Sequence, residues 1–375
     1  MISGILFSFG LMFGQFISYY GLTIPIEKDL KSWSQSTKNI DFLDESFDLK
    51  SLQILRLIDE TGEFTDWQKV QLSIKTAKHL FPDDTTKNTI LNFFLLKNLQ
   101  YDLVAAYNRS NDLIPLVASE QNLYGIAFFK IGGVRYYDLL GLTKSTDSDR
   151  KAISIHNDDT RTDGTKKLYI DFEQKPFTGK ILSIKTLSWN YKENTYSFDV
   201  SVNIFLRSYY HDLPNLDYSY LLNYQFSDEL RKTLIDPLRI EFTKQKLSDV
   251  ERAECLRQMI LQCFPYIDDD ALFGYEHIQF PEELLLSEGC DCEDRAIFLY
   301  KLLIELTDLT PLLADYPMHV SVLVEDHDAV EGTRFYYKGK SFIYCDPTFF
   351  NAPIGAVPDA IKDIQPDIIE RKSRE

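Results

Sequence analysis

Cysteine is scarce in this sequence, with five residues among 375. So few cysteines, and an odd number of them, exclude a scaffold in which disulfides take the place of a hydrophobic core. Cys255 and Cys263 cannot bridge each other, because they lie on one expected helix and the helical rise separates them by about 12 Å. The other three cysteines are Cys290, Cys292 and Cys345.

Clusters of lysine and arginine are also missing, and the formal net charge is -17. A surface for nucleic acid or for an anionic membrane needs grouped positive side chains, so both kinds of partner are excluded. Apolar residues make up 44% and aromatic residues 14% of the chain, which is a globular composition and not a disordered one. The length allows two or three domains.

Apolar runs long enough to span a bilayer are absent as well. The apolar stretch at residues 5–13 has the length of the central region of a signal peptide, and no charge precedes Glu27. We therefore predict a signal peptide over residues 1–22, cleaved near Gly14 or Gln15, and a periplasmic or secreted protein. The alternatives are a buried N-terminal strand and a misassigned start, and no integral membrane segment is expected in the mature chain.

Periodicity predicts an α+β protein. Helical periodicity covers residues 50–81, 89–99, 247–264 and 296–306, and strand-like alternation covers 103–141, 167–206 and 318–348. A polar, turn-rich stretch at 142–165 is expected to be a linker. The expected domains are an N-terminal helical and β part at 23–145, a small antiparallel β-domain at 165–210, and a C-terminal domain at 215–375.

The two halves of the chain repeat one order of elements. Each has a helix ending in Phe-Pro, an apolar helix, and strands with a glycine turn. One interpretation is that 23–145 is a copy of part of 215–375, and the other is that the two parts share only a common order of helices and strands. In this alignment Thr85 stands where Cys292 stands, and no histidine occurs between residues 80 and 155. The copy is therefore expected to be inactive.

The stretch EGCDCEDRA, residues 288–296, opens the apolar helix of the second half. Asp291 is a suitable N-cap, which places Cys292 at the positive end of the helix dipole, where the pKa of a thiol falls. Glu293 and Asp294 act in the opposite direction. A reactive thiolate at this place therefore needs a cation beside it, most simply a histidinium.

His319 and Asp346 are the residues that can complete such a site. His319 lies in an alternating strand, on the face opposite three valines, and Asp346 closes the strand at 341–346. A carboxylate there can accept the second imidazole N–H and fix the tautomer, with Cys292 as the nucleophile.

This order of Cys, His and Asp resembles the transglutaminase-like cysteine protease superfamily, whose core is of the papain type. The similarity is greatest to a secreted bacterial branch with DCEDRA and CDPT blocks. The matching segments here are FGYEHIQFPEE, DCEDRAIFLYKLL, YPMHVSVLV and YCDPTFFNAPIG, all within 250–360.

The resemblance implies a papain-like core over 215–375, in which a helix packs on an antiparallel sheet. It gives Cys292 the role of nucleophile, His319 that of base, and Asp346 that of orienting group. The implied activity is acyl transfer through a thioester on peptide or amide bonds. We expect hydrolysis of a peptide, protein or cell-wall peptide, without cofactor or metal. The alternatives are an amine-accepting cross-linking enzyme and a non-catalytic interaction module.

Cys290 departs from the pattern of that branch, where a small or hydroxyl residue is expected. A disulfide from Cys290 to Cys292 or to Cys345 remains open, and the first would block the nucleophile. A metal held by these cysteines with His319 or His327 is disfavoured, because one intervening residue is too few for a zinc knuckle.

Overall fold

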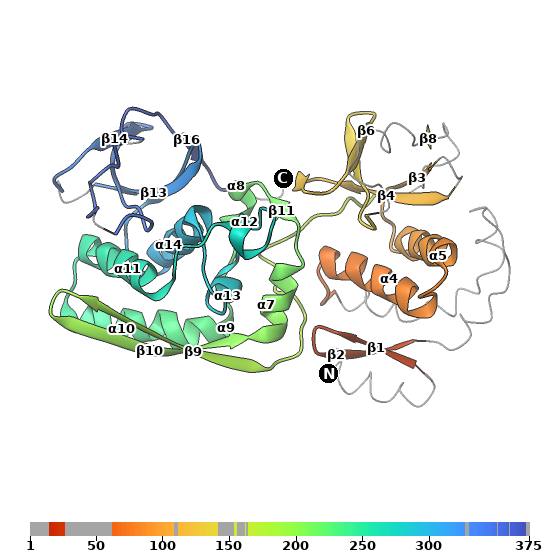
Figure 1. The fold of residues 1–375 in the computed structure, drawn as a ribbon, viewed down its shortest axis with the longest axis horizontal. Helices are drawn as coiled ribbons and strands as arrows, with labels where there is room; N and C mark the ends of the chain where they lie inside the picture. Colours follow the sequence, from red (N-terminus) through yellow and green to blue (C-terminus); the bar gives the residue numbers. More distant parts are fainter. Residues whose placement is uncertain are drawn as a thin grey trace. The chain divides into compact units, whose positions relative to one another are not determined.

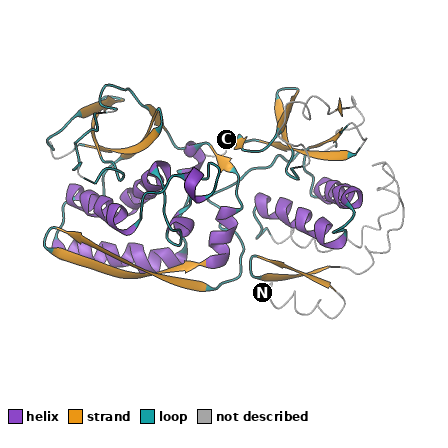
Figure 2. Cartoon of the chain, in the orientation of Figure 1, coloured by secondary structure: helices purple, strands orange, loops and turns teal. Residues whose placement is uncertain are grey.

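The structure is a computed structural model that describes residues 15–26, 62–108, 112–141, 154–155, 162, 164–326, 330–350, 352–359 and 361–372 (Figure 1). It is a mixed α+β protein of helices and antiparallel sheets, as the sequence predicts (Figure 2). Most of the expected signal peptide, the helical segment before residue 62, most of the 142–165 linker and His327 lie outside the described residues. Among the residues described, no helix combines the length and apolar character needed to cross a membrane.

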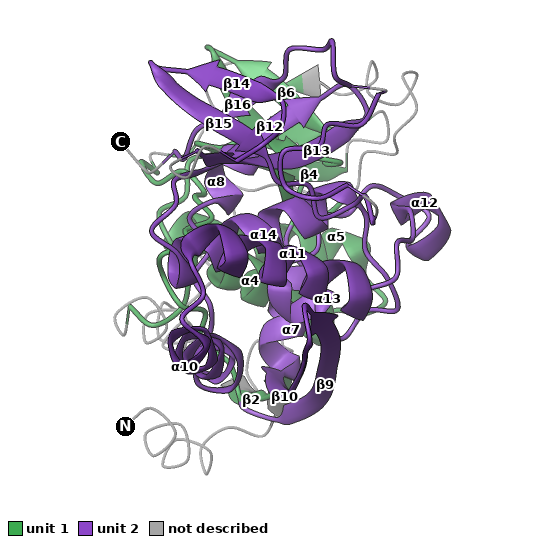
Figure 3. Ribbon diagram, turned by 90° about the vertical axis from the view of Figure 1, so that its left-hand side faces the viewer, with its two compact units in different colours: residues 1–179, 214–216 green, residues 180–213, 217–375 purple. Residues whose placement is uncertain are grey.

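The chain divides into two compact units (Figure 3). The first comprises residues 1–179 and 214–216, and the second comprises 180–213 and 217–375.

The stretch predicted as a small β-domain, 165–210, is divided between the two units. Its hairpin, β9 (Leu182–Tyr191) and β10 (Asn194–Asn203), lies in the second unit and packs against α11 (Asp249–Cys263). A lone hairpin is marginally stable in water, so its apolar face needs a partner of this kind.

Two other expectations for this stretch differ from the structure. Residues 167–173 form no strand; Lys166 and Leu168 make only isolated bridges, to Tyr101 and Ser119. β10 ends at Asn203, because the Asn203 side chain accepts the Phe205 N–H and starts helix α7 (Ile204–His211).

The first unit holds a hairpin, two helices and a five-stranded antiparallel sheet. The hairpin is β1 (Gln15–Tyr19) with β2 (Leu22–Ile26), and a short pair joins β5 (Leu123–Tyr124) to β11 (Asn215–Leu216). The helices are α4 (Asp66–Leu80) and α5 (Thr85–Asn98). The sheet runs β6 (Phe128–Ile131), β7 (Val134–Tyr137), β4 (Leu113–Ser119), β3 (Leu103–Tyr107) and β8 (Ser154–Ile155).

The second unit follows the hairpin β9–β10 with helices and a second five-stranded antiparallel sheet. Its further helices are α8 (Tyr218–Leu221), α9 (Asp228–Leu230), the π-helical turn η4 (Arg231–Ile235), α10 (Asp236–Gln245), α12 (Asp269–Leu272), α13 (Pro281–Leu284) and α14 (Cys292–Leu306). The sheet runs β14 (Arg334–Tyr337), β15 (Lys340–Tyr344), β13 (His319–Glu325), β12 (Pro311–Tyr316) and β16 (Asp367–Ile369).

The two sheets have one strand order. In chain order within its own sheet, each places the third strand at one edge, then the fourth, second, first and fifth. Two helices described in each unit come before its sheet, α4 and α5 in the first and α11 and α14 in the second. The first helix of each pair begins with a capping box, Thr65 with Gln68 in α4 and Ser248 with Glu251 in α11. Among the described residues, both units therefore contain a hairpin, a pair of helices and a sheet in this order, and the second unit has further helices between its hairpin and α11 and between α11 and α14.

The connection between the two helices is where the units differ. α4 ends at Leu80 and α5 begins at Thr85, whereas residues 264–291 separate α11 from α14. Two backbone hydrogen bonds close the base of this longer segment. Cys290 N–H donates to the Pro265 carbonyl at 3.1 Å, and Ile267 N–H donates to the Cys290 carbonyl at 3.2 Å.

Helix α14 positions the candidate nucleophile. Its residues are buried almost throughout, with only Ile304 and Glu305 outside the buried class, and it packs against β12, β13 and α11. Its apolar stretch from Ala296 to Leu303 is interrupted only by Lys301, and its first turn carries the buried charged residues Glu293, Asp294 and Arg295. The first residue of α14 is Cys292.

Candidate active site

The Cys292 side chain lies where the start of α14 meets the start of β13. Its thiol is buried and donates a hydrogen bond to Glu293 Oε2 at 3.1 Å. The sulfur also has a hydrogen bond with the backbone N–H of Val320, the residue that follows His319. The candidate nucleophile therefore sits beside the strand that carries the candidate base.

His319 is the first residue of β13, directly after the tight turn at Pro317 and Met318. Its Nε2 lies 2.6 Å from Asp346 Oδ2, and 11% of the side chain is exposed. The ring of Phe349 packs edge-on against the imidazole, with the ring centres 5.4 Å apart. Because Nε2 is engaged by Asp346, Nδ1 is the nitrogen left to exchange a proton.

Asp346 follows β15 and is almost fully buried. Its Oδ2 accepts a second hydrogen bond, from the Tyr344 hydroxyl at 2.7 Å, and its Oδ1 accepts the Thr348 N–H at 2.6 Å. Burial acts to raise the pKa of Asp346, but the hydrogen bond and the charge of His319 outweigh it and lower that pKa. The carboxylate is therefore ionised and fixed in orientation.

Two buried arginines hold the segment around Asp346, and neither was found from the sequence. Arg257 of α11 donates to the carbonyls of Asp346 and Phe349, at 3.3 and 3.0 Å. Arg295 of α14 donates to the Pro347 carbonyl at 3.2 Å. One signal was present: Arg257 stands four residues after Ala253, within the apolar face of its helix, and a charged residue there needs buried partners.

The groups around the thiol keep it protonated. Burial, followed by the nearby Glu293 carboxylate, raises the pKa of Cys292 well above its usual value. Burial and Glu293 also raise the pKa of Asp291 to about 8. The pKa of Glu293 is raised as well, chiefly by burial. Burial and these neighbouring carboxyl groups therefore favour the thiol over the thiolate at Cys292.

The same carboxyl groups are the ones that could hold a cation beside Cys292. One oxygen from each of Asp269, Asp291 and Glu293 lies within 4.8 Å of the others. Oδ1 of Asp269 and Oδ1 of Asp291 are buried and have no hydrogen-bond partner. Oxygen donors of this kind suit a hard divalent ion.

All five cysteines are free thiols. Cys290 is fully buried, and its sulfur accepts a hydrogen bond from Arg295 Nε at 3.4 Å. Burial raises the pKa of Cys290 to about 12. Neither of the two disulfides left open by the sequence is formed, and within the described residues no cysteine belongs to a group close enough to share a metal ion.

The structure thus brings His319 and Asp346 into direct contact and places Cys292 against the residue next to His319. This arrangement supplies a thiol, an imidazole with one free nitrogen, and a buried carboxylate that orients it. No family model matches the chain, and neither does any curated protein or solved structure.

Proposed function

We propose that the second unit catalyses cysteine-dependent acyl transfer on peptide or amide bonds, with Cys292, His319 and Asp346 as nucleophile, base and orienting group. The observation that carries the proposal is the 2.6 Å contact of His319 Nε2 with Asp346, formed beside the strand residue that hydrogen-bonds with the Cys292 sulfur. A helix before an antiparallel sheet, with these three residues in this order, is also what a papain-like transglutaminase core requires.

In the proposed reaction His319 Nδ1 takes the thiol proton as Cys292 Sγ attacks the carbonyl carbon. A C–S bond forms, the C–N bond breaks, and the imidazolium returns its proton to the departing amine. Water then attacks the thioester, His319 takes its proton, and the thiol is restored. The Cys292 backbone N–H is a candidate donor to the oxyanion, because first-turn N–H groups have no partner within the helix.

Water is the proposed acceptor, and the substrate class is a peptide, protein or cell-wall peptide. An amine acceptor would give a cross-linking enzyme by the same first step. The two outcomes are separated by the products, since hydrolysis releases a free carboxylic acid and transamidation leaves an amide of changed mass.

The first unit is proposed to be an inactive copy of the same core. Thr85 begins α5 as Cys292 begins α14, and each follows an aspartate N-cap, Asp84 or Asp291. A threonine hydroxyl without a base nearby is a poor nucleophile. The acyl-transfer chemistry is therefore assigned to the second unit.

The test is a screen of peptides and cell-wall peptides, read by mass spectrometry, on the wild-type chain and the Cys292→Ala variant. Cys263→Ala is the matched control, because Cys263 is a free thiol on α11 outside the site. We expect turnover by the wild type and by the control, and none by Cys292→Ala. Equal turnover by all three chains would refute the proposal for those substrates.

One observation favours a second candidate, a non-catalytic interaction module. A thiol has a single hydrogen, and that of Cys292 is donated to Glu293 and so not to His319. Alkylation of Cys292 at neutral pH distinguishes the two candidates. If the protein is an enzyme, His319→Ala strongly slows the alkylation of Cys292. If it is an interaction module, the wild type and His319→Ala are both alkylated at the rate of an ordinary buried thiol.

A further inference from the structure

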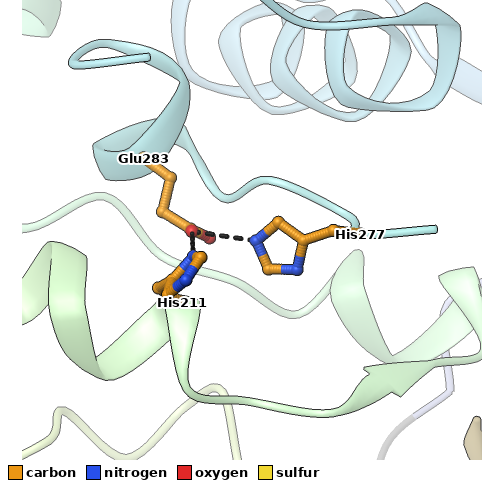
Figure 4. Close-up of side chains that lie close together, drawn as sticks. All are labelled: His211, His277 and Glu283. Atoms are coloured by element: carbon orange, nitrogen blue, oxygen red, sulfur yellow. Dashed lines mark hydrogen bonds and ion pairs between the residues drawn. The ribbon is translucent and has the colours of Figure 1, made fainter. Parts of the chain in front are cut away.

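We propose that His211, His277 and Glu283 form a binding site for a divalent metal ion of the zinc type, separate from the candidate active site. The three side chains come from three segments: the end of α7, the loop before α13, and α13 itself (Figure 4). One ligand atom from each lies within 4.8 Å of the others. Two imidazoles and one carboxylate are a donor set that zinc takes in proteins.

The distances need little change to accept an ion. His211 Nδ1 lies 2.9 Å and His277 Nε2 lies 3.0 Å from the same oxygen, Glu283 Oε1. Tetrahedral ligands about 2.0–2.1 Å from zinc are roughly 3.3 Å from each other. Withdrawal of the carboxylate by a few tenths of an ångström would therefore open the space for the metal.

The surroundings hold the donors toward one another. Glu283 Oε2 accepts the Phe280 N–H at 3.2 Å, which turns Oε1 to the imidazoles. The Phe273 ring packs edge-on against His277, with ring centres 4.8 Å apart, and lies 6.2 Å from His211. Metal sites depend on outer contacts of this kind to fix ligand orientation.

The charge of the group also suits a cation. Glu283 is nearly fully buried, and its Oε1 lies within hydrogen-bond distance of both ring nitrogens. Each imidazole presents an N–H to this oxygen, because a carboxylate oxygen accepts and does not donate. A metal ion would take the place of those two hydrogens, as metal binding at histidine requires.

Access is through His211. Its side chain is 36% exposed, whereas those of His277 and Glu283 are 4% and 3% exposed. Three protein ligands with one open side leave the fourth position to water. A bound ion would link residues 264–291, which connect α11 to α14, to helix α7 of the same unit.

The experiment is a titration of the untagged full chain, stripped with a chelator, with Co²⁺ alone as the probe. Cys292→Ser serves as the parent chain, so that the thiol cannot compete. We expect one Co²⁺ per chain, d–d bands in the visible region, no thiolate-to-cobalt charge transfer in the near ultraviolet, and displacement by Zn²⁺. His211→Ala and Glu283→Gln should weaken binding by more than the roughly 10–100-fold that loss of an outer contact costs.

His79→Ala is the matched control, because His79 is an exposed histidine at the end of α4. It should bind Co²⁺ as the parent does, and circular dichroism of the metal-free chains checks that each variant is folded. The proposal is overturned by a parent chain that does not bind Co²⁺. Unchanged binding in both site variants, or a thiolate charge-transfer band, overturns it equally. A parent chain that does not bind Co²⁺ overturns the proposal even if a variant fails to fold.

Discussion

Asp346 and Asp138 occupy equivalent places in the two sheets. Each stands just after the fourth strand of its sheet, Asp138 one residue and Asp346 two residues past its end, and each is buried. Each accepts through Oδ1 the N–H of the residue two positions on, at 2.6 Å for Asp346 and 3.2 Å for Asp138. The tyrosines two positions before them pair with Leu323 and Ala118. His319 stands four residues before Leu323, and Ile114 stands four residues before Ala118. The position of the imidazole beside Asp346 is therefore taken by an isoleucine in the sheet of Asp138.

Asp346→Asn should reduce turnover, and with it the rate of Cys292 alkylation at neutral pH. An amide can hold the ring but cannot stabilise the imidazolium, and loss of acid–base function of this kind costs about 10²–10⁴-fold. The matched control is Asp138→Asn, which makes the same change at the equivalent turn and should leave both rates unchanged. Equal losses in the two variants would point to a structural role for the turn instead.

Glu293→Gln should make Cys292 more reactive. The amide removes the carboxylate that, after burial, raises the pKa of the thiol. Each unit by which that pKa falls gives about a tenfold larger thiolate fraction. Iodoacetamide labelling followed by mass spectrometry, in a buffer with a chelator, measures the rate, and Cys263 in the same chain is the internal standard. A Cys292 rate that stays constant or falls would contradict the assignment.

Arg257→Met should destabilise the second unit by about 3 kcal/mol. It leaves the Glu254 carboxylate and two backbone carbonyls without their buried donor. Arg239→Met is the comparison, because Arg239 also pairs with an acid three residues away but is half exposed, so its loss should cost within about 1 kcal/mol. Urea unfolding measures both, and equal midpoints would show that Arg257 does not hold the Asp346 segment.

Asp291→Asn should flatten the dependence of stability on pH. Asp291 has a pKa of about 8 in the folded chain and about 3.9 when unfolded. Between these values the folded chain holds a proton that the unfolded chain releases, so stability falls as the pH rises. Asparagine keeps the N-cap and removes this contribution.

Between about pH 5 and about pH 8, with a chelator present, the unfolding temperature should therefore fall less steeply with rising pH for Asp291→Asn than for the wild type. Asp84→Asn, at the N-cap of α5, controls for the change of cap. Parallel curves for the wild type and Asp291→Asn would contradict a raised pKa at this position.

Local signals in the sequence were enough for much of the fold. The amphipathic run at 247–264 contains α11, and the alternation predicted at 167–206 contains the hairpin β9–β10. The capping aspartate before Cys292 does mark the first residue of α14. These features depend on residues near one another in the chain, where period and capping are visible.

Pairing between distant segments was not visible. β12 begins with a proline and reads PLLADY, which does not alternate cleanly between apolar and polar residues. It is a strand because β13 and β16 pair with it on both sides. Residues 167–173 alternate as a strand does, yet have no continuous partner. At the candidate site, the sequence order led us to expect Cys292, His319 and Asp346 together, and the contact between His319 and Asp346 is formed. The two buried arginines were not expected, because the carbonyls that they bind lie far along the chain.

The segment between α11 and α14 begins and ends at one place, because Pro265, Ile267 and Cys290 close its base by backbone hydrogen bonds. A loop whose ends meet costs its host little, since the path of the chain on either side is the same with or without it. The first unit already joins its two helices directly. The connection is therefore an insertion between two helices that leaves the strand order of the sheet the same as in the first unit. His277, Glu283 and the Gln279 N–H that donates to Asp294 all lie within this insertion.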